Sequence, residues 1–232
     1  MNVNINQAGY EENVATVENI HFNIEASQLL GMIGPNGAGK STTIKTILGQ
    51  VAFFEGNIEQ KEGTTYSFIP ERPIYYDELT LWEHFEFVAA VEGLGEESLI
   101  YAKQFLEKFK LIDHLHEFPR SFSKGMQQKG MIALALFTKP DILIIDEPFM
   151  GLDPSSTKLL LKLIDDECKK GTGVLMCTHI LDTAQRICDS FIIIEKGLMK
   201  ANGNLQEVLK QCDVHTGSLY DCIADEEDIN EE

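Results

Sequence analysis

A glycine-rich loop between a strand pattern and a helix pattern constrains this chain more than any other feature. The segment LLGMIG, residues 29–34, is continuously apolar, as buried strands of parallel sheets are. It runs directly into GPNGAGKST, residues 34–42, and the chain has helical content over 39–48. Glycine adopts backbone conformations that other residues avoid, so three glycines allow this loop to curl tightly. We therefore predict an α/β fold with the loop at the carboxyl end of a buried strand.

The loop matches the pattern G-x-x-x-x-G-K-[ST], in which successive backbone N–H groups face a phosphate. Lys40 would reach the β- and γ-phosphates of a nucleotide, and Ser41 would ligate Mg²⁺. The helix N-terminus would add its partial positive charge. The alternative, a glycine-rich loop that binds nothing, is disfavoured because motif and context agree. The predicted phosphate-binding residues are Gly34, Pro35, Asn36, Gly37, Ala38, Gly39, Lys40, Ser41 and Thr42.

Polar side chains at the ends of two later strands add to this prediction. Asp146 and Glu147 end the apolar strand ILIIDE, where a P-loop NTPase needs a second Mg²⁺ ligand and a group that positions water. Taken alone, they are also consistent with a plain pair of charges at a strand end. His179 ends the strand GVLMCTH; such a histidine is commonly structural or exposed. Ligands of α/β proteins gather at the carboxyl ends of parallel strands, which favours a role for it.

Strand and helix patterns alternate along most of the chain, which predicts a mostly parallel sheet covered by helices. A helical stretch at about 71–138 interrupts the alternation and suggests an inserted subdomain, in which Ser98 would cap the second helix. The expected strands are 14–25, 29–34, 56–60, 65–70, 141–146, 173–179 and 190–195. The expected helices are 39–48, two within 81–110, 126–137, 154–170 and 181–188.

Composition narrows the class of protein. A formal net charge of −18 argues against nucleic-acid binding, which needs a dense basic face. No apolar run approaches the roughly 18 residues of a membrane span, and the polar start lacks the features of a secretory signal. The five cysteines form no C-x-x-C, as expected for free thiols in a reducing cytosol. Residues 220–232 carry seven acids and no base, which predicts a solvated, partly disordered tail.

The order of these motifs resembles the ATP-binding cassette (ABC) ATPase family over nearly the whole chain. Between the P-loop and ILIIDE lies FSKGMQQK, residues 122–129, in the place of the family's signature L-S-G-G-Q and the following Q-x-[RK]. Ser123 and Gly125 match the signature, whereas Phe122, Lys124 and Met126 depart from it. The resemblance implies that this stretch contacts an ATP held by the P-loop of a second subunit. The alternative is that Ser123 only caps the next helix.

The resemblance assigns further positions. Asp153 in GLDP matches the D-loop aspartate at the dimer interface, and His179 matches the switch histidine that contacts the γ-phosphate. Tyr10 stands in the place of the aromatic residue that stacks on adenine. Glu71 replaces the usual glutamine; its carboxylate can ligate Mg²⁺, but it lacks N–H donors and adds negative charge beside ATP. The segments IPE, ELTLWEH, FSKGM and DEPFMGLDP together resemble the ATPase subunit of Ecs-type bacterial ABC transporters.

The fold that the resemblance implies is a RecA-like P-loop NTPase core with a small antiparallel β portion and an inserted α-helical subdomain. The cassette would span 1–212, followed by an acidic tail over 213–232. The implied function is Mg²⁺-dependent ATP hydrolysis that drives export through a separate transmembrane permease, which would bind beside the Glu71 loop. Two ATPase subunits, expected to be identical, would sandwich ATP on the inner face of the membrane.

Two other functions stay open at this point. A soluble ABC ATPase acting on ribosomes or DNA usually has two cassettes, a coiled-coil insertion or basic segments; this chain has one cassette and an acidic balance. A nucleotide-binding regulator without turnover is disfavoured, since Lys40, Asp146, Glu147 and His179 are all present.

Overall fold

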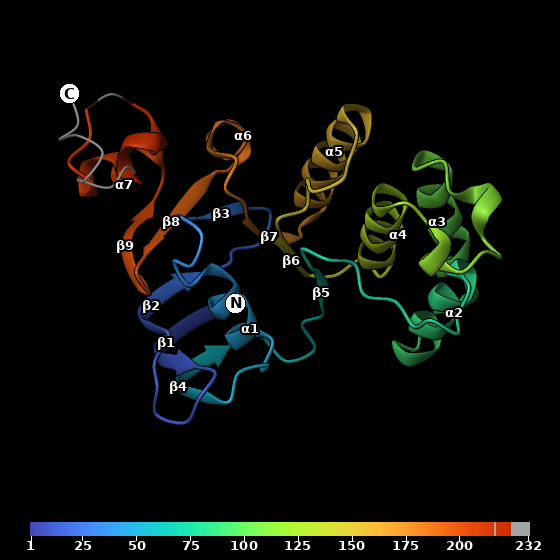
Figure 1. Ribbon diagram of the computed structural model, residues 1–232, viewed down its shortest axis with the longest axis horizontal. Helices are drawn as coiled ribbons and strands as arrows, with labels where there is room; N and C mark the ends of the chain where they lie inside the picture. The colour runs from blue at the N-terminus through green and yellow to red at the C-terminus, as the bar shows by residue number, and fades with distance from the viewer. Residues whose placement is uncertain (216, 224–232) are drawn as a thin grey trace. The chain divides into compact units, whose positions relative to one another are not determined.

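The computed structural model describes residues 1–215 and 217–223, and these form two compact units (Figure 1). The sheet unit comprises Met1–Thr64 and the described residues from Gly173 onward. The helical unit comprises Thr65–Thr172. No helix in the described part of the chain is both long enough and apolar enough to cross a membrane.

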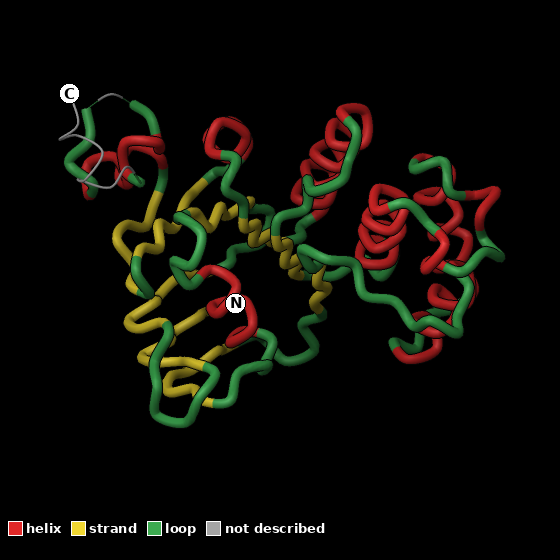
Figure 2. Tube along the Cα trace, viewed as in Figure 1, coloured by secondary structure: helices red, strands yellow, loops and turns green. Residues whose placement is uncertain are grey.

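Strands dominate the sheet unit (Figure 2). Their spatial order within it is β4-β1-β2-β9-β8-β3-β7. The pairs β1–β2, β1–β4 and β8–β9 are antiparallel, and β2–β9, β3–β7 and β3–β8 are parallel. The strands are β1 (Asn2–Gly9), β2 (Val17–Asn23), β3 (Leu29–Ile33), β4 (Phe53–Glu59), β7 (Gly173–Cys177), β8 (Ser190–Glu195) and β9 (Leu198–Gly203). Its helices are α1 (Lys40–Ile47), α6 (Leu181–Ile187), α7 (Leu205–Gln211) and the 3₁₀ turn η3 (Leu219–Cys222).

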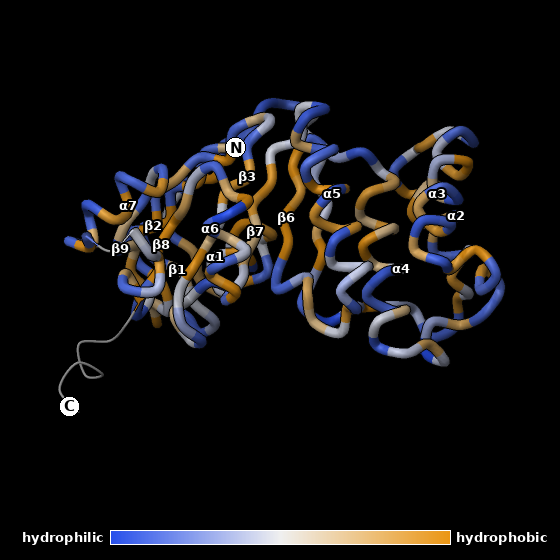
Figure 3. Tube along the Cα trace, turned by 90° about the horizontal axis from the view of Figure 1, so that it is seen from above, coloured by the Kyte–Doolittle hydropathy of each residue, from blue (hydrophilic) through white to orange (hydrophobic). Residues whose placement is uncertain are grey.

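Complete burial explains why the parallel strands could be predicted from apolar runs in the sequence. Every residue of β3 and β7 is buried, as in strands covered on both faces, and β8 is drawn in the hydrophobic colour (Figure 3). In β1, by contrast, buried Val3 and Ile5 alternate with exposed Asn2 and Asn4. This strand, together with β9 and α7, was not predicted.

The helical unit joins two parallel strands to four α-helices. Its elements are β5 (Tyr66–Ile69), β6 (Ile142–Asp146), α2 (Leu81–Val91), α3 (Glu96–Lys108), α4 (Lys124–Leu136), α5 (Pro154–Lys170) and the 3₁₀ turns η1 (Ile112–His114) and η2 (Pro119–Ser121). Thr80 and Glu83 form a reciprocal capping box at the start of α2. The predicted inserted segment, about 71–138, contains α2, α3 and α4.

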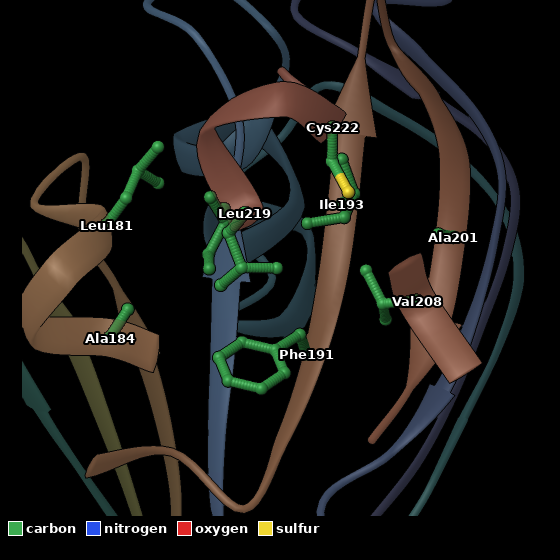
Figure 4. Packing of buried hydrophobic residues seen from close by; sticks show 9 residues of the cluster. Leu181, Ala184, Phe191, Ile193, Ala201, Val208, Leu219 and Cys222 are labelled. Carbon is green, nitrogen blue, oxygen red and sulfur yellow. The ribbon is translucent and has the colours of Figure 1, made fainter. Parts of the chain in front are cut away.

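Two sequence predictions about local structure were wrong. Ser98 does not cap α3: Gly95 is the N-cap residue, and the Ser98 hydroxyl donates back to the Gly95 carbonyl from inside the first turn. The described start of the acidic tail is not solvated throughout. Leu219 and Cys222 are buried in a cluster with Val208 (Figure 4) because η3 folds back against α7. Residues 216 and 224–232 of the predicted tail lie outside the described residues.

Candidate nucleotide-binding site

The P-loop follows β3 and ends at α1, as the sequence predicted. Gly37 and Gly39 have φ values of 81° and 109°, in the left-handed region that favours glycine. A Cβ at Gly34 would collide with the carbonyl oxygen of Ile194, so this position requires glycine because of close packing. A Cβ at Gly37 would meet no atom within 4 Å, which leaves the apex of the loop open.

Lys40 is the first residue of α1 and is only 7% exposed. Its Nζ atom donates hydrogen bonds to the carbonyl oxygens of Gly34 and Pro35, at 2.7 and 3.0 Å. The ammonium group therefore lies over the loop, where phosphate oxygens would add further acceptors for its N–H groups. Pro35 and Asn36 are exposed, Ala38 is buried, and exposed Ser41 lies in the first turn of α1. This arrangement fits a bound nucleotide phosphate and its Mg²⁺.

The turn between β8 and β9 forms a hydrogen bond to the P-loop backbone. The backbone N–H of Gly197, in the turn between β8 and β9, donates to the Ala38 carbonyl at 2.9 Å. The Gly197 carbonyl accepts a hydrogen bond from the Glu18 N–H at 2.8 Å, and its φ is 80°. Sequence reasoning missed this residue. The signal was Lys196-Gly197, a short polar turn between two strands.

Tyr10 lies beside α1. The Thr42 hydroxyl donates to the Tyr10 hydroxyl at 3.4 Å, and the Lys45 ammonium lies 5.2 Å from the centroid of the ring. The ring is 47% exposed, so it retains accessible surface. The structure thus brings Tyr10 to the helix that follows the P-loop, although the two are distant in sequence.

His179 shares an edge of the sheet with the P-loop. Met32 of β3 pairs with Cys177 of β7 in parallel register, and Gly34 and His179 each come two residues later in the chain, just after the strands end. Both therefore follow the carboxyl ends of neighbouring strands in the sheet unit. The His179 side chain is exposed there, as a residue that contacts a ligand would be.

Three carboxylates lie at the corresponding edge of the helical unit, after the ends of two paired strands. Ile69 of β5 pairs with Ile145 of β6 in parallel register, so Glu71 and Glu147 follow their strands at the same level and Asp146 lies one residue before that level. Asp146 is buried, Glu147 is half-buried and Glu71 is exposed. Glu147 has a φ of 45°, unusual for a residue with a side chain. Such backbone strain is common where function fixes a conformation.

The signature stretch begins α4. The Ser123 side chain accepts a hydrogen bond from the Met126 N–H at 3.3 Å, so Ser123 is the N-cap residue. Gly125 lies against the loop that precedes α5: a Cβ here would lie 2.7 Å from the Gly151 carbonyl oxygen. The signature and the D-loop thus pack against each other within the helical unit.

Asp153 strengthens that contact. It caps α5, accepting from the Ser156 N–H at 2.9 Å, and forms an ion pair with Lys129 of α4 at 2.8 Å. Its carboxylate also accepts from the hydroxyls of Ser155 and Ser156. The Lys129 ammonium, followed by these hydroxyl and backbone donors, holds the pKa of Asp153 well below its usual range. Asp153 is therefore a fixed negative charge at this surface.

An apolar cavity of about 510 Å³ opens in the helical unit, and residues that follow Glu71 in the chain form part of its lining. Its lining includes Ile74, Tyr76, His84 and Phe87. The neutral His84 ring bridges the loop to α2: Nδ1 donates to the Thr80 carbonyl at 2.8 Å, and Nε2 accepts from the Tyr76 N–H at 2.9 Å. Sequence reasoning did not single out His84, because only the fold brings residues 76 and 84 together.

Comparisons with known proteins agree with this geometry. A family model described as "ABC transporter" matches residues 17–150. The ABC transporter ATP-binding protein YthP of Bacillus subtilis is 44% identical over 96% of this chain and 94% of its own length. EcsA of the same organism is 43% identical over 92% and 90%.

Solved structures give the same result. One described as an ATP-binding subunit of an ABC transporter superposes with a TM-score of 0.88 and 38% identity, covering 95% of this chain and 96% of its own. CbiO1 of Clostridium perfringens, described as part of the CbiONQ transporter complex, has a TM-score of 0.70 at 22% identity, covering 89% of each chain. The second likeness concerns the fold alone.

The fold and the strand–loop–helix phosphate site define a P-loop nucleoside triphosphatase of the α/β class. Within that class, this chain belongs to the ABC transporter family, as an ATP-binding subunit with ATP hydrolase activity. The predicted fold class and the predicted resemblance, including that to the Ecs-type ATPase, are confirmed.

Proposed function

We propose that this chain drives a transporter whose translocation path belongs to a separate membrane permease, and that the transporter exports its cargo. The observation that carries the proposal is the apolar cavity of the helical unit, whose lining includes Ile74 and Tyr76. An ATPase that drives a permease needs a surface on which the permease can dock. The export direction rests on the resemblance to Ecs-type ATPases. The chain would then work at the inner face of the cell membrane, held there by its permease.

In this proposal the P-loop binds the ATP phosphates through its backbone N–H groups and Lys40. The exposed Tyr10 ring stacks on adenine. Ser41 and Asp146 ligate Mg²⁺, and Glu71 completes the ligand set through a carboxylate oxygen. Support comes from the open apex of the loop and from the position of Glu71, Asp146 and Glu147 at the carboxyl ends of two paired strands.

Hydrolysis needs a group that activates water. We assign this role to Glu147, which accepts the proton of the attacking water as general base. His179 donates toward the γ-phosphate and so holds it during the attack. The exposed position of His179 at the P-loop edge supports this role.

The second half of each ATP site would come from another copy of the chain. Ser123 and Gly125, at the N-terminus of the 13-residue helix α4, would face the partner's γ-phosphate, and Asp153 would contact the partner beside them. The packing of Gly125 against Gly151 and the Lys129–Asp153 ion pair support this, because they fix the signature and the D-loop as one surface.

The permease would insert a cytoplasmic segment into the cavity of the helical unit. Large apolar side chains at this cavity are exposed to an extent that calls for a partner: Ile74 is 74% exposed, Tyr76 57% and Phe87 45%. A helix that presents apolar side chains on one face would fill such a groove.

The test is co-purification from the membranes of native cells, with tagged wild type and two matched variants. Ile74→Asp places a charge at the cavity, whereas Ile100→Asp places one on α3, at a similarly exposed residue outside the cavity lining. We expect wild type and Ile100→Asp to bring down one membrane-spanning protein, and Ile74→Asp to lose it while retaining basal ATP hydrolysis. If Ile74→Asp retains the membrane protein, the docking site is wrong. If wild type instead sediments with ribosomes or DNA, the transport function is wrong.

A further inference from the structure

Two cysteines meet at the carboxyl-terminal end of the sheet unit. Cys212 is the residue that ends α7, and Cys222 is the last residue of η3. Cys222 is 1% exposed and belongs to the buried cluster with Val208 and Leu219 (Figure 4). Half-buried Cys212 packs against this cluster. The two thiols are hydrogen-bonded to each other. Two thiols, one at the end of α7 and one at the end of η3, therefore lie at the same buried cluster.

We infer that Cys212 and Cys222 form an oxidisable dithiol, which a low-molecular-weight disulfide converts to an intrachain disulfide. Both side chains pack in the same cluster and interact with each other, which places the two sulfur atoms on the same side of η3 and α7. The contrast in exposure gives the two thiols different parts in the reaction. Cys212 is accessible to a small disulfide, while Cys222 is shielded from it.

The exchange balances in two steps. The Cys212 thiolate attacks one sulfur of the small disulfide, forming a mixed disulfide and releasing one thiolate. Cys222 then loses its proton and attacks the Cys212 sulfur, which releases the second thiolate. Two protein thiols become one disulfide, the small disulfide is reduced to two thiols, and the two protons pass to the released thiolates.

The surroundings of Cys222 bear on the order of the two steps. Burial, with the hydrogen bond that the neutral Cys222 thiol makes to Cys212 as a second cause, raises the pKa of the Cys222 thiol to about 12, so Cys222 does not react first. The Lys200 ammonium acts in the opposite direction on Cys222, and it is itself held by Glu195 at 2.8 Å. This cation lies where it can stabilise the thiolate that forms in the second step.

The disulfide would fasten η3 to α7 across a cluster that also includes Phe191 and Ile193 of β8. Oxidation would thus lock η3 onto the unit that contains the P-loop. The other cysteines serve as internal controls. Cys188 is the most informative, because it also packs against this cluster, whereas Cys168 lies in α5 and Cys177 in β7.

The experiment treats the native full-length chain with oxidised glutathione, alkylates it after denaturation, and measures its intact mass and digest. We expect loss of two alkylatable thiols, a peptide cross-link between positions 212 and 222, restoration by dithiothreitol, and a higher unfolding temperature. Cys188→Ala should behave as wild type. Cys212→Ser should form no internal disulfide, and Cys222→Ala should stop at a glutathione adduct on Cys212.

Three results would overturn the inference. In the first, wild type keeps all five thiols alkylatable under oxidant that saturates a control dithiol peptide. In the second, wild type accumulates only the glutathione adduct. In the third, the cross-link joins Cys188 instead. Because Cys222 is buried, its variant could unfold; the half-buried Cys212 variant and the digest map of wild type then decide the question.

Discussion

Substitution of Gly125 tests whether the signature stretch serves an ATP held by another subunit. The structure predicts two separable effects. Any Cβ at position 125 lies 2.7 Å from the Gly151 carbonyl oxygen, so even alanine must displace the loop before α5. Such overpacking typically costs about 1–3 kcal/mol. Gly125→Ala and Gly125→Asp should therefore lower the free energy of unfolding by similar amounts.

The aspartate adds a charge effect that alanine lacks. A carboxylate roughly 5 Å from one negative charge, at an effective dielectric constant of about 20, is disfavoured by about 3 kcal/mol. This corresponds to a loss of turnover on the order of a hundredfold beyond that of Gly125→Ala. ATP binding by the isolated monomer should stay near wild type in both variants, because the P-loop lies in the other unit.

The assay measures unfolding, monomer ATP affinity and turnover for wild type and both variants. Mixing Gly125→Asp with Lys40→Ala chains adds a test in trans, since one of the two composite sites then joins an intact P-loop to an intact signature. That site should bind ATP at the interface and cross-link, whereas neither variant alone should. Equal turnover in the alanine and aspartate variants would refute the charge argument. Loss of ATP binding by the Gly125→Asp monomer would show that the stretch acts in cis.

Further predictions concern the base, the metal and pH. Tyr10→Ala should weaken ATP binding by about 1 kcal/mol while Tyr10→Phe changes little, in titrations of nucleotide affinity; equal affinities would place the stacking residue elsewhere. Glu71→Gln should raise the Mg²⁺ concentration needed for half-maximal hydrolysis, and an unchanged requirement would remove Glu71 from the ligand set. Burial lowers the pKa of His84, so its contribution to stability is present above the ordinary pKa of about 6.5 and is lost as pH falls through the folded value. Denaturant midpoints should therefore fall less on acidification in His84→Gln than in wild type; equal falls would contradict this.

The sequence predicted the elements that appear in it as uninterrupted apolar runs or as a motif of fixed spacing. The buried strands β3, β6 and β7 are apolar runs, and the P-loop has a spacing that few other sites share. In β1, Val3 and Ile5 alternate with Asn2 and Asn4, a pattern readable as a half-buried strand, but the polar composition of this segment obscured it. The short helix α7 also escaped prediction, although its capping box, Asn204 with Glu207, is readable as N-x-x-E.

Candidate site residues could be selected from the sequence where they follow strands, and less so where tertiary packing positions them. Asp146 and Glu147 were selected because a P-loop NTPase needs carboxylates after such a strand, and the rule that parallel strands present ligands at their carboxyl ends favoured His179. The contact of Gly125 with Gly151 and the pair of thiols at Cys212 and Cys222 depend on tertiary packing. Neither hydrophobic periodicity nor a sequence motif predicts which segments that are distant in one sequence will contact each other in the fold.

The most direct test of the central claim is the oligomeric state of Glu147→Gln in ATP and Mg²⁺, measured together with turnover. Without the general base, hydrolysis should fall roughly 10²–10⁴-fold while ATP binding survives. Size-exclusion chromatography with light scattering should then detect a dimer that retains ATP, and the double variant with Lys40→Ala should remain monomeric. A Glu147→Gln chain that hydrolyses ATP at the normal rate, or that binds ATP and stays monomeric, would contradict the account.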